Sequence, residues 1–434
     1  MNDFRRVHRA TPLLRFWTTI LALFTVLLLN MNASAFSSVA KFLEGDSSHL
    51  LWLVGAVAVF AVMCVFVWWG SGIWWRAMGF RLSEEEVAIR SGVVSTRLRT
   101  ARYDRIQAVD VVEPVIARIF GVAKVRIETA GGIDSALEIL YLTRPEAEQV
   151  RAEVLAHLNG VNVAAPADES LEFIPPIPIE RSLVAAILHP AALITAGGIA
   201  LGIVLPGGLG IILPVVVGFG PWIWGIIDRS WQFTATLHDD ALNISYGLAD
   251  RRRQTIPLQR IHAVKISQPL LWRLTGWWQV QVSVAGYGLG DKQGGTTTLL
   301  PVGTKVQAVD MVAALSPLDQ AEVSPEQATD PTFVTPSRAW WLTPIDCSRQ
   351  TVTILGERAV VVHSGRFGRR MSVIAPPHIQ EITLVRGPIA RLLHVSNVRL
   401  DLVRGPVGMT VRQLDDGDVE QLMKMLRKRQ LPKL

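Results

Sequence analysis

An internal repeat is the feature that most constrains the fold. A shift of 155 positions aligns residues 87–128 with residues 242–283 without a gap, and a further shift of 118 positions aligns these with residues 360–401. Identical residues recur at equivalent places in the three copies: Gly92, Gly247 and Gly365; Arg97, Arg252 and Arg370; Ile106, Ile261 and Ile379; Arg118, Arg273 and Arg391. The chain therefore repeats one small folded unit three times.

Each copy has the pattern of a β-rich unit that ends in a helix. Apolar residues alternate with polar ones at Val87 and Ile89, as in a strand with one buried face. Thr143 and Glu146 have the spacing of a helix-capping box, and residues 304–307 repeat it. We expect three α+β units, each a strongly bent antiparallel sheet or small barrel of about six or seven strands with a C-terminal helix.

Long uncharged segments accompany this pattern. Only 18% of the residues are charged, and none lies in 16–40, 47–75 or 182–227. About 20 apolar residues make one helical crossing of a membrane. The first two segments predict one crossing each, and the third predicts two, joined by Pro206-Gly207-Gly208. We expect four transmembrane helices in two α-helical hairpins; a cleaved signal peptide is the alternative for the first.

Charges flank these segments unequally. Arginines precede the first segment and follow the second, Arg181 precedes the third, and Arg229 follows the fourth. The positive-inside rule then predicts a multi-pass protein of the bacterial plasma membrane with its N-terminus and all three units in the cytoplasm. Tryptophans cluster at the ends of the second and fourth predicted helices, as expected at a membrane interface.

These features divide the chain into seven segments. We expect an N-terminal tail and first hairpin at 1–80, a first unit at 81–160, a linker at 161–181, a second hairpin at 182–230, a second unit at 231–317, a Pro-rich linker at 318–345 and a third unit at 346–434. The third unit has no hairpin of its own.

Four features of the first copy suggest a family. They are Gly92, the segment Arg105-Ile106-Gln107-Ala108-Val109, the turn Arg118-Ile119-Phe120-Gly121 and the strand Val125-Arg126-Ile127-Glu128-Thr129. In combination with the hairpins, they resemble the bacterial pleckstrin-homology-like domain family, specifically its YdbT-like multi-pass membrane proteins. The resemblance implies pleckstrin-homology-like units. The third copy departs from the pattern, with His394 in place of the turn glycine.

The sequence shows no catalytic or metal-binding constellation. The glycine-rich segment 286–295 is not followed by the Lys-Ser/Thr of a phosphate-binding loop. Cys347 with His363 or His378 is read as a set of ordinary strand residues, and Cys64 and Cys347 have no metal-ligand spacing. His189 is the one ionisable residue expected at membrane depth. We predict no enzyme activity, no cofactor and no metal.

Basic clusters are the remaining functional signal. Nine arginines follow the repeated glycine: Arg97, Arg99, Arg102, Arg251, Arg252, Arg253, Arg366, Arg369 and Arg370. They are either solvated hairpin residues that orient the chain in the membrane or contacts for anionic lipid headgroups. Because the third copy keeps its arginines far from any span, we expect an isolated fragment 345–434 to bind anionic vesicles.

The predicted function is a non-enzymatic membrane-anchored scaffold or binding protein. Its cytoplasmic units would face anionic lipid headgroups, a protein partner or one another. The alternative is a membrane enzyme or transport component whose working site lies in the hairpins. Neither nucleic acid nor a small-molecule substrate is expected as a partner, since the net charge is only +6 and no aromatic-interleaved basic face is present.

Overall fold

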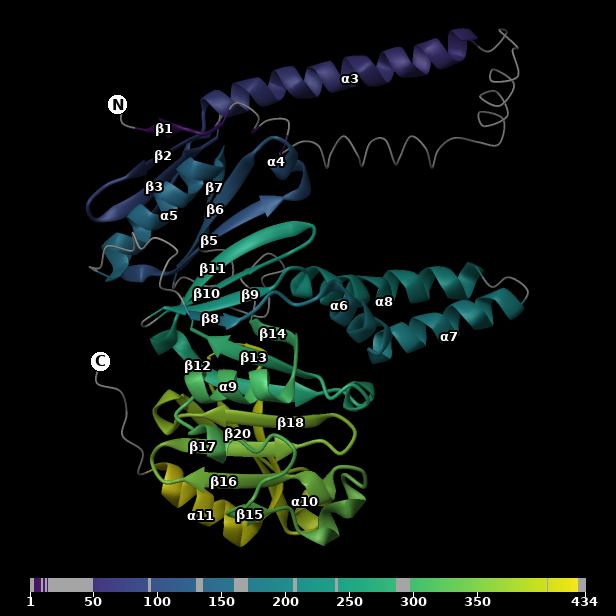
Figure 1. Ribbon diagram of the computed structural model, residues 1–434, viewed down its shortest axis with the longest axis vertical. Coiled ribbons are helices and arrows are strands. Elements are labelled where there is room, and N and C mark those ends of the chain that lie inside the picture. The colour runs from purple at the N-terminus through teal and green to yellow at the C-terminus, as the bar shows by residue number, and fades with distance from the viewer. Residues whose placement is uncertain are drawn as a thin grey trace. The chain divides into compact units, whose positions relative to one another are not determined.

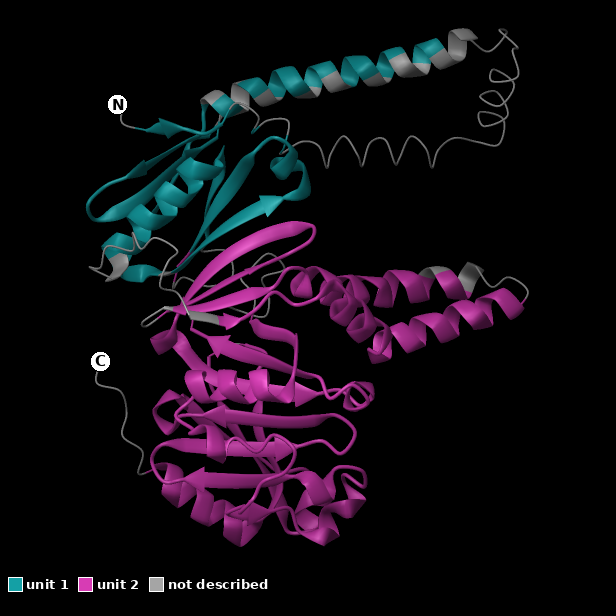
Figure 2. Ribbon diagram, viewed as in Figure 1, with its two compact units in different colours: residues 1–127, 136–164 teal, residues 128–135, 165–434 magenta. Residues whose placement is uncertain are grey.

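The computed structural model describes residues 4–8, 11, 14, 50–92, 95–129, 136–159, 171–205, 209–238, 241–285, 297–403 and 405–427. The chain divides into two compact units, with residues 1–127 and 136–164 in unit 1 and residues 128–135 and 165–434 in unit 2 (Figure 2). The predicted first span, the turn at 206–208 and the glycine-rich segment 286–295 lie outside the described residues.

Unit 1 holds the first copy of the repeat. One antiparallel sheet has the order β1-β2-β3-β4, and three further strands have the order β7-β6-β5. The helix α5 closes the copy, and its Val150 joins a core that contains Val87, Ile106, Val125 and Ile127. The elements are β1 Arg5–Arg6, α3 Leu50–Arg76, β2 Gly79–Leu82, β3 Glu86–Ser91, β4 Arg97–Arg102, β5 Ile106–Pro114, α4 Val115–Ile119, β6 Val122–Thr129, β7 Leu137–Thr143 and α5 Arg144–Asn159.

Unit 2 holds the second copy, whose element order repeats that of the first (Figure 1). Its strands have the orders β11-β10-β9-β8 and β14-β13-β12, and the capping box predicted at 304–307 is present at the start of α9. The elements are β8 Leu171–Ile174, β9 Thr234–His238, β10 Ala241–Tyr246, β11 Asp250–Pro257, η3 Leu258–Arg260, β12 Ile261–Gln268, η4 Leu271–Arg273, β13 Trp278–Val284, β14 Thr298–Gly303 and α9 Lys305–Leu315.

The third copy completes unit 2 with the orders β18-β17-β16-β15 and β19-β20-β21. Val398, Leu400 and Met409 pack against Leu422 of its closing helix. The elements are β15 Phe333–Val334, η6 Ser337–Trp341, η7 Cys347–Arg349, β16 Thr351–Leu355, β17 Ala359–Ser364, β18 Arg369–Ile374, η8 Pro376–His378, β19 Glu381–Val385, α10 Pro388–Leu392, β20 Val395–Asp401, β21 Met409–Asp415 and α11 Asp416–Arg427. The segment predicted to be a Pro-rich linker thus contains β15 and η6.

Backbone conformation confirms the alignment of the copies. Gly92, Gly247 and Gly365 have φ values of 105°, 118° and 87°. A Cβ atom on Gly247 or on Gly365 would lie 1.9 Å from the carbonyl oxygen three residues later. Only glycine adopts such a conformation without strain, which explains why all three copies have glycine at this position. His394 has a φ of 51° at the place that glycine occupies in the other copies.

The second and third copies share one sheet. Residues 263–268 of β12 pair antiparallel with residues 369–374 of β18, so the sequence of strands runs from β14 to β15 without a free edge at the junction. Beside this junction the rings of His262 and His378 stack, with centroids 4.3 Å apart. The pairing fixes the third copy against the second within unit 2.

Three helices lie between the first and second strands of the second copy. They are α6 Ile179–Ile187, α7 Pro190–Val204 and α8 Leu209–Ser230. Ala185 of α6 packs against Trp272 and Val302, while α7 and α8 extend away from the strands (Figure 1). The helices are therefore an insertion within the repeated unit and do not precede it.

The predicted α-helical transmembrane hairpins are wrong for the described residues. No single helix among them is both long and apolar enough to cross a membrane; α6 and α7 meet that requirement only together, and they are bent by 59°. Pro190 causes this break, because it lacks the N–H of a continuing helix and excludes helical backbone at His189, which is extended. The expected multi-pass topology therefore has no support in this part of the chain.

We expect Gly365→Ala to destabilise the chain by about 2 kcal/mol or more, since positive-φ strain is joined there by a backbone clash. Gly356→Ala is the matched control, because Gly356 also has positive φ but open space around its Cβ position. Gly356→Ala should lower the free energy of unfolding by only about 1 kcal/mol. Chemical denaturation of both variants measures the difference, and equal losses would contradict the steric argument.

We expect the junction between copies two and three to lose stability in acid. Burial, aided by the charges of His378 and Arg260, lowers the pKa of His262 from 6.5 to about 4. The unfolded chain therefore takes up this proton below pH 6.5, whereas the folded chain resists it until about pH 4, so stability falls across that window. His262→Gln, the residue found at equivalent positions 107 and 380, should reduce the loss in denaturation midpoints between pH 7 and pH 5. His157→Gln on α5 should leave it unchanged.

Candidate functional site

The predicted arginines occupy equivalent hairpins in the three copies. Arg97, Arg99 and Arg102 lie exposed on β4 of unit 1, and Arg102 is 3.4 Å from Asp104. The second cluster, Arg251, Arg252 and Arg253, lies half-buried on β11, where Arg252 is 3.9 Å from Asp250. Arg369 and Arg370 lie on β18, and Arg366 lies in the turn before it. Each copy brings its own arginines together.

The turn of the third copy contains an exposed arginine and an exposed aromatic side chain. It reads Gly365-Arg366-Phe367-Gly368, with Phe367 54% exposed. The Arg366 N–H donates to Asp346 Oδ1 at 2.9 Å, and the guanidinium of Arg273 donates to the Arg366 carbonyl. Arg273 comes from η4 of the second copy, so two copies build this surface together.

Five arginines lie in or near this turn, namely Arg273, Arg349, Arg366, Arg369 and Arg370. Burial, followed by the nearby charges of Arg369 and Arg349, lowers the pKa of Arg273. Burial and the charge of Arg370 lower the pKa of Lys265 to about 8, and its Nζ donates to the Pro406 carbonyl at 3.0 Å. Burial is the larger cause of both shifts, and the neighbouring arginine charges add a smaller effect in the same direction.

Two carboxylates balance this charge in part. Glu326 is 3.7 Å from Arg369 and also 3.0 Å from Lys305, while Asp346 accepts from the turn backbone. Arg349 donates to Gln327, which is neutral. Positive charge therefore exceeds negative charge among these groups. Sequence reasoning missed Arg349, and it identified Arg273 only as a repeated residue.

An aspartate fixes the turn in both copies of unit 2. Asp228, at the end of α8, accepts hydrogen bonds from the Leu248 and Ala249 N–H groups at 3.0 and 2.7 Å. Asp346 makes the equivalent contact in the third copy, and the two residues are 118 positions apart, as the repeat requires. The aspartate thus connects the chain before each second strand with the turn of its own copy.

Exposed apolar side chains cover α7 and α8. They are Leu193, Ile194, Leu201, Ile203, Val204, Val216, Val217, Trp222 and Trp224. Soluble monomers rarely expose so many large apolar side chains on adjoining elements, and such patches mark protein or membrane contacts. The Trp272 indole N–H donates to the Ala185 carbonyl at 3.0 Å, which joins α6 to the helix that carries Arg273. Basic turn and apolar helices are thereby connected in one unit.

The residues considered for catalysis have structural contacts. Cys347 is buried and its thiol donates to the Pro336 carbonyl, while His363 Nε2 lies 2.8 Å from the Ser324 carbonyl. Burial raises the pKa of the Cys347 thiol, which disfavours the nucleophilic thiolate. His189 accepts from the Ala191 N–H at 3.2 Å and caps α7. Within the described ranges no three His, Cys, Asp or Glu side chains form a metal-binding group.

Comparison with known proteins agrees with the repeated fold. A family model of the bacterial PH domain matches residues 35–158, 183–321 and 331–430. The transmembrane protein YdbT of Bacillus subtilis (strain 168) is 27% identical over 311 residues, or 63% of this chain and 62% of that protein. The chain therefore matches less than two thirds of that relative. No solved structure matches this chain. The family resemblance predicted from the repeat is confirmed.

We expect Asp228→Ala to destabilise the chain more than Asp228→Asn. Alanine removes both hydrogen bonds to the turn, each worth about 1.5–3 kcal/mol when the acceptor is charged, whereas asparagine keeps a neutral acceptor. Amide hydrogen exchange at Leu248 and Ala249 measures the loss directly. Unchanged protection in the alanine variant would show that the aspartate does not hold the turn.

Proposed function

The chain belongs to the bacterial PH domain family, and we propose that it is a non-enzymatic, membrane-associated protein whose basic turns bind anionic lipid headgroups. A relative named as a transmembrane protein supports the membrane as its location. In this proposal the apolar side chains of α7 and α8 contact the lipid, and the PH-like units hold the arginines at the headgroup level.

The observation that carries the proposal is the connected surface of unit 2. Arg366 contacts Arg273, Arg273 follows Trp272 in η4, and Trp272 contacts α6. These contacts link the arginines through Trp272 to α6, which leads into the two helices with exposed apolar side chains. Lipid phosphates favour arginine through charge-assisted hydrogen bonds, and hydrocarbon favours the neighbouring apolar groups. A bilayer with anionic lipid has phosphate groups at its surface and hydrocarbon beneath them, so it can contact both the arginines and the apolar side chains.

A protein partner is the second candidate for this surface. An acidic protein could neutralise the same arginines, and an apolar partner could cover α7 and α8. The lipid proposal is preferred because positive charge and large exposed apolar side chains occur in one unit and are linked through Trp272, a combination found in proteins that bind membrane surfaces. The comparison of variants below distinguishes the two.

The test uses the full chain. A fragment that begins at residue 345 would lack β15 and would expose the edge of β18 that pairs with β12, so its failure to bind would have no clear meaning. Copy three is therefore examined in the presence of copy two.

We expect replacement of Arg366, Arg369 and Arg370 by Ser to weaken binding to vesicles with phosphatidylglycerol by on the order of 100-fold, at about 1 kcal/mol per arginine. Binding to neutral phosphatidylcholine vesicles should change little. The wild-type preference for anionic vesicles should also decline as salt rises through about 0.15 M, because salt screens exposed charges. Vesicle flotation at several lipid concentrations measures both effects.

Replacement of Arg358, Arg399 and Arg412 by Ser is the matched control. It removes the same charge, but Arg358 lies in the turn at the opposite end of β17, and the others lie on β20 and β21. An equal loss of vesicle affinity in both variants would show that the effect comes from net charge and not from the position of the arginines. If the wild-type chain shows no preference for anionic vesicles, the lipid proposal fails and the protein partner becomes the better candidate.

A further inference from the structure

The third copy contains a short counterpart of the helical insertion. In the second copy, α6, α7 and α8 fill the connection between β8 and β9; in the third, η6 and η7 fill the connection between β15 and β16. The repeat shift of 118 positions continues through this segment. Trp222 matches Trp340, Ile227 matches Ile345, Asp228 matches Asp346 and Ser230 matches Ser348. Residues 337–349 are thus equivalent to the end of α8, and we name them the copy-three platform.

The copy-three platform exposes large apolar side chains. Trp340 is 53% exposed, Trp341 is 76% exposed and Ile345 is 51% exposed. The two indole rings meet edge to face, with centroids 5.4 Å apart. On α8 the matching Trp222 is 65% exposed. Neither the core nor the sheet junction requires these rings at the surface, and tryptophan is the residue most suited to the boundary between water and hydrocarbon.

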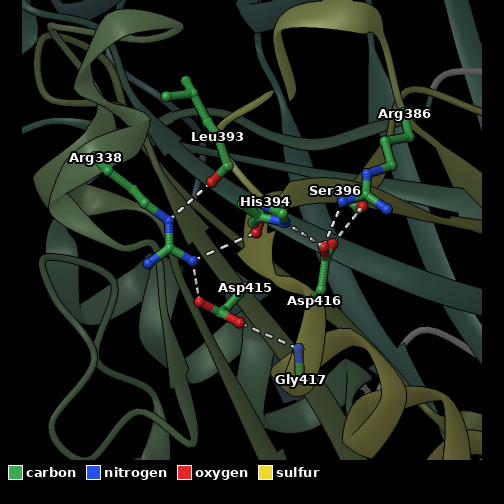
Figure 3. A network of polar contacts seen from close by, with 8 residues as sticks. All are labelled: Arg338, Arg386, Leu393, His394, Ser396, Asp415, Asp416 and Gly417. Carbon is green, nitrogen blue, oxygen red and sulfur yellow. Dashed lines mark hydrogen bonds and ion pairs between the residues drawn. The ribbon is translucent and has the colours of Figure 1, made fainter. Parts of the chain in front are cut away.

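Contacts to residues 393, 394 and 415 of the same copy hold one end of the platform. Arg338 Nε donates to the Leu393 carbonyl at 2.8 Å, and its guanidinium also reaches the His394 carbonyl and the Asp415 carboxylate (Figure 3). Ala339 is buried beneath it. Leu393 follows α10, whose Leu392 is 80% exposed. The platform therefore lies next to a second exposed apolar element.

The basic turn holds the other end. Asp346 accepts from the Arg366 N–H, and the exposed Arg349 lies close enough to Arg273 to affect its pKa. Apolar side chains of the platform are thus placed between α10 and the arginines of the turn. This arrangement repeats, on a smaller scale, the combination of apolar helix and basic turn in the second copy.

We propose that the copy-three platform is a separate membrane-contact site, at which Trp340, Trp341 and Ile345 enter the headgroup region of an anionic bilayer. The inference rests on the proposed function and adds a second, shallow point of contact to it. Two observations select a lipid surface as the occupant: the adjoining arginines complement anionic headgroups, and the platform is the sequence counterpart of the tryptophan-bearing end of α8. The copy that lacks the α6–α8 insertion would thereby have a membrane contact of its own.

The test places a fluorescent amino acid at position 341 of the full chain, in vesicles that contain phosphatidylglycerol. We expect a blue shift, and quenching by lipids that carry a nitroxide near the headgroup. The same label at exposed Glu357, in the turn at the opposite end of β17, is the control and should show neither effect. A chain that binds the vesicles without quenching at 341 overturns the platform but leaves the proposed function intact. A chain that does not bind anionic vesicles overturns both.

A second variant measures the contribution to affinity. Trp340→Ser with Trp341→Ser should weaken binding to anionic vesicles on the order of tenfold, and Trp340→Phe with Trp341→Phe should restore part of it, because phenylalanine keeps the apolar ring. Val306→Ser, at a 66% exposed side chain on α9, is the control for loss of exposed apolar surface. Equal affinities of the wild-type chain and the double serine variant would contradict the proposal.

Discussion

The arrangement of unit 2 depends on the pairing of β12 with β18. An unpaired strand at the edge of a sheet exposes a row of backbone N–H and carbonyl groups, which is a liability in a three-stranded sheet with one buried face. Here the four-stranded sheet of the third copy supplies the missing neighbour, from Ala263 opposite Ile374 to Gln268 opposite Arg369. The same register brings the turn of the third copy to η4 of the second, so that Arg273 reaches the Arg366 carbonyl. The backbone pairing of β12 with β18 thus brings together the arginines of the basic surface.

Much of the repeated fold could be predicted from the sequence, because its signals are local. Gly247 and Gly365 mark a turn that no other residue adopts without strain, and Thr304 with Gln307 marks a helix start. The number and length of the helices was harder to predict. An uncharged run does not reveal that Pro190 divides it or that β8 precedes it in the same sheet, since both depend on the backbone and on pairing across the insertion.

In the candidate site too, the residues that are close in sequence could be predicted, whereas those that come together only through the fold could not. Arg366, Arg369 and Arg370 were evident as a basic cluster behind a glycine, whereas Arg273 and Arg349 join them only through the fold. Arg273 occupies a repeated position, yet its role at the turn exists only where another copy follows in the same sheet. No pattern within a single copy predicts that contact, because its two partners are 93 residues apart.

The equivalence of Asp228 and Asp346 shows that the turn is held in the same way with and without the α6–α8 insertion. In both copies the aspartate lies just before the second strand and holds the turn from below, so the turn does not depend on the length of the connection that precedes it. The two copies share only the last part of that connection, which contains the tryptophan (Trp222 or Trp340) and the aspartate (Asp228 or Asp346). The third copy has Trp340 and Asp346 in this part, and Arg338 holds it through hydrogen bonds to the Leu393 and His394 carbonyls. The exposed tryptophan side chains of this part lie outside the core, so packing alone does not account for their presence at equivalent positions in two copies.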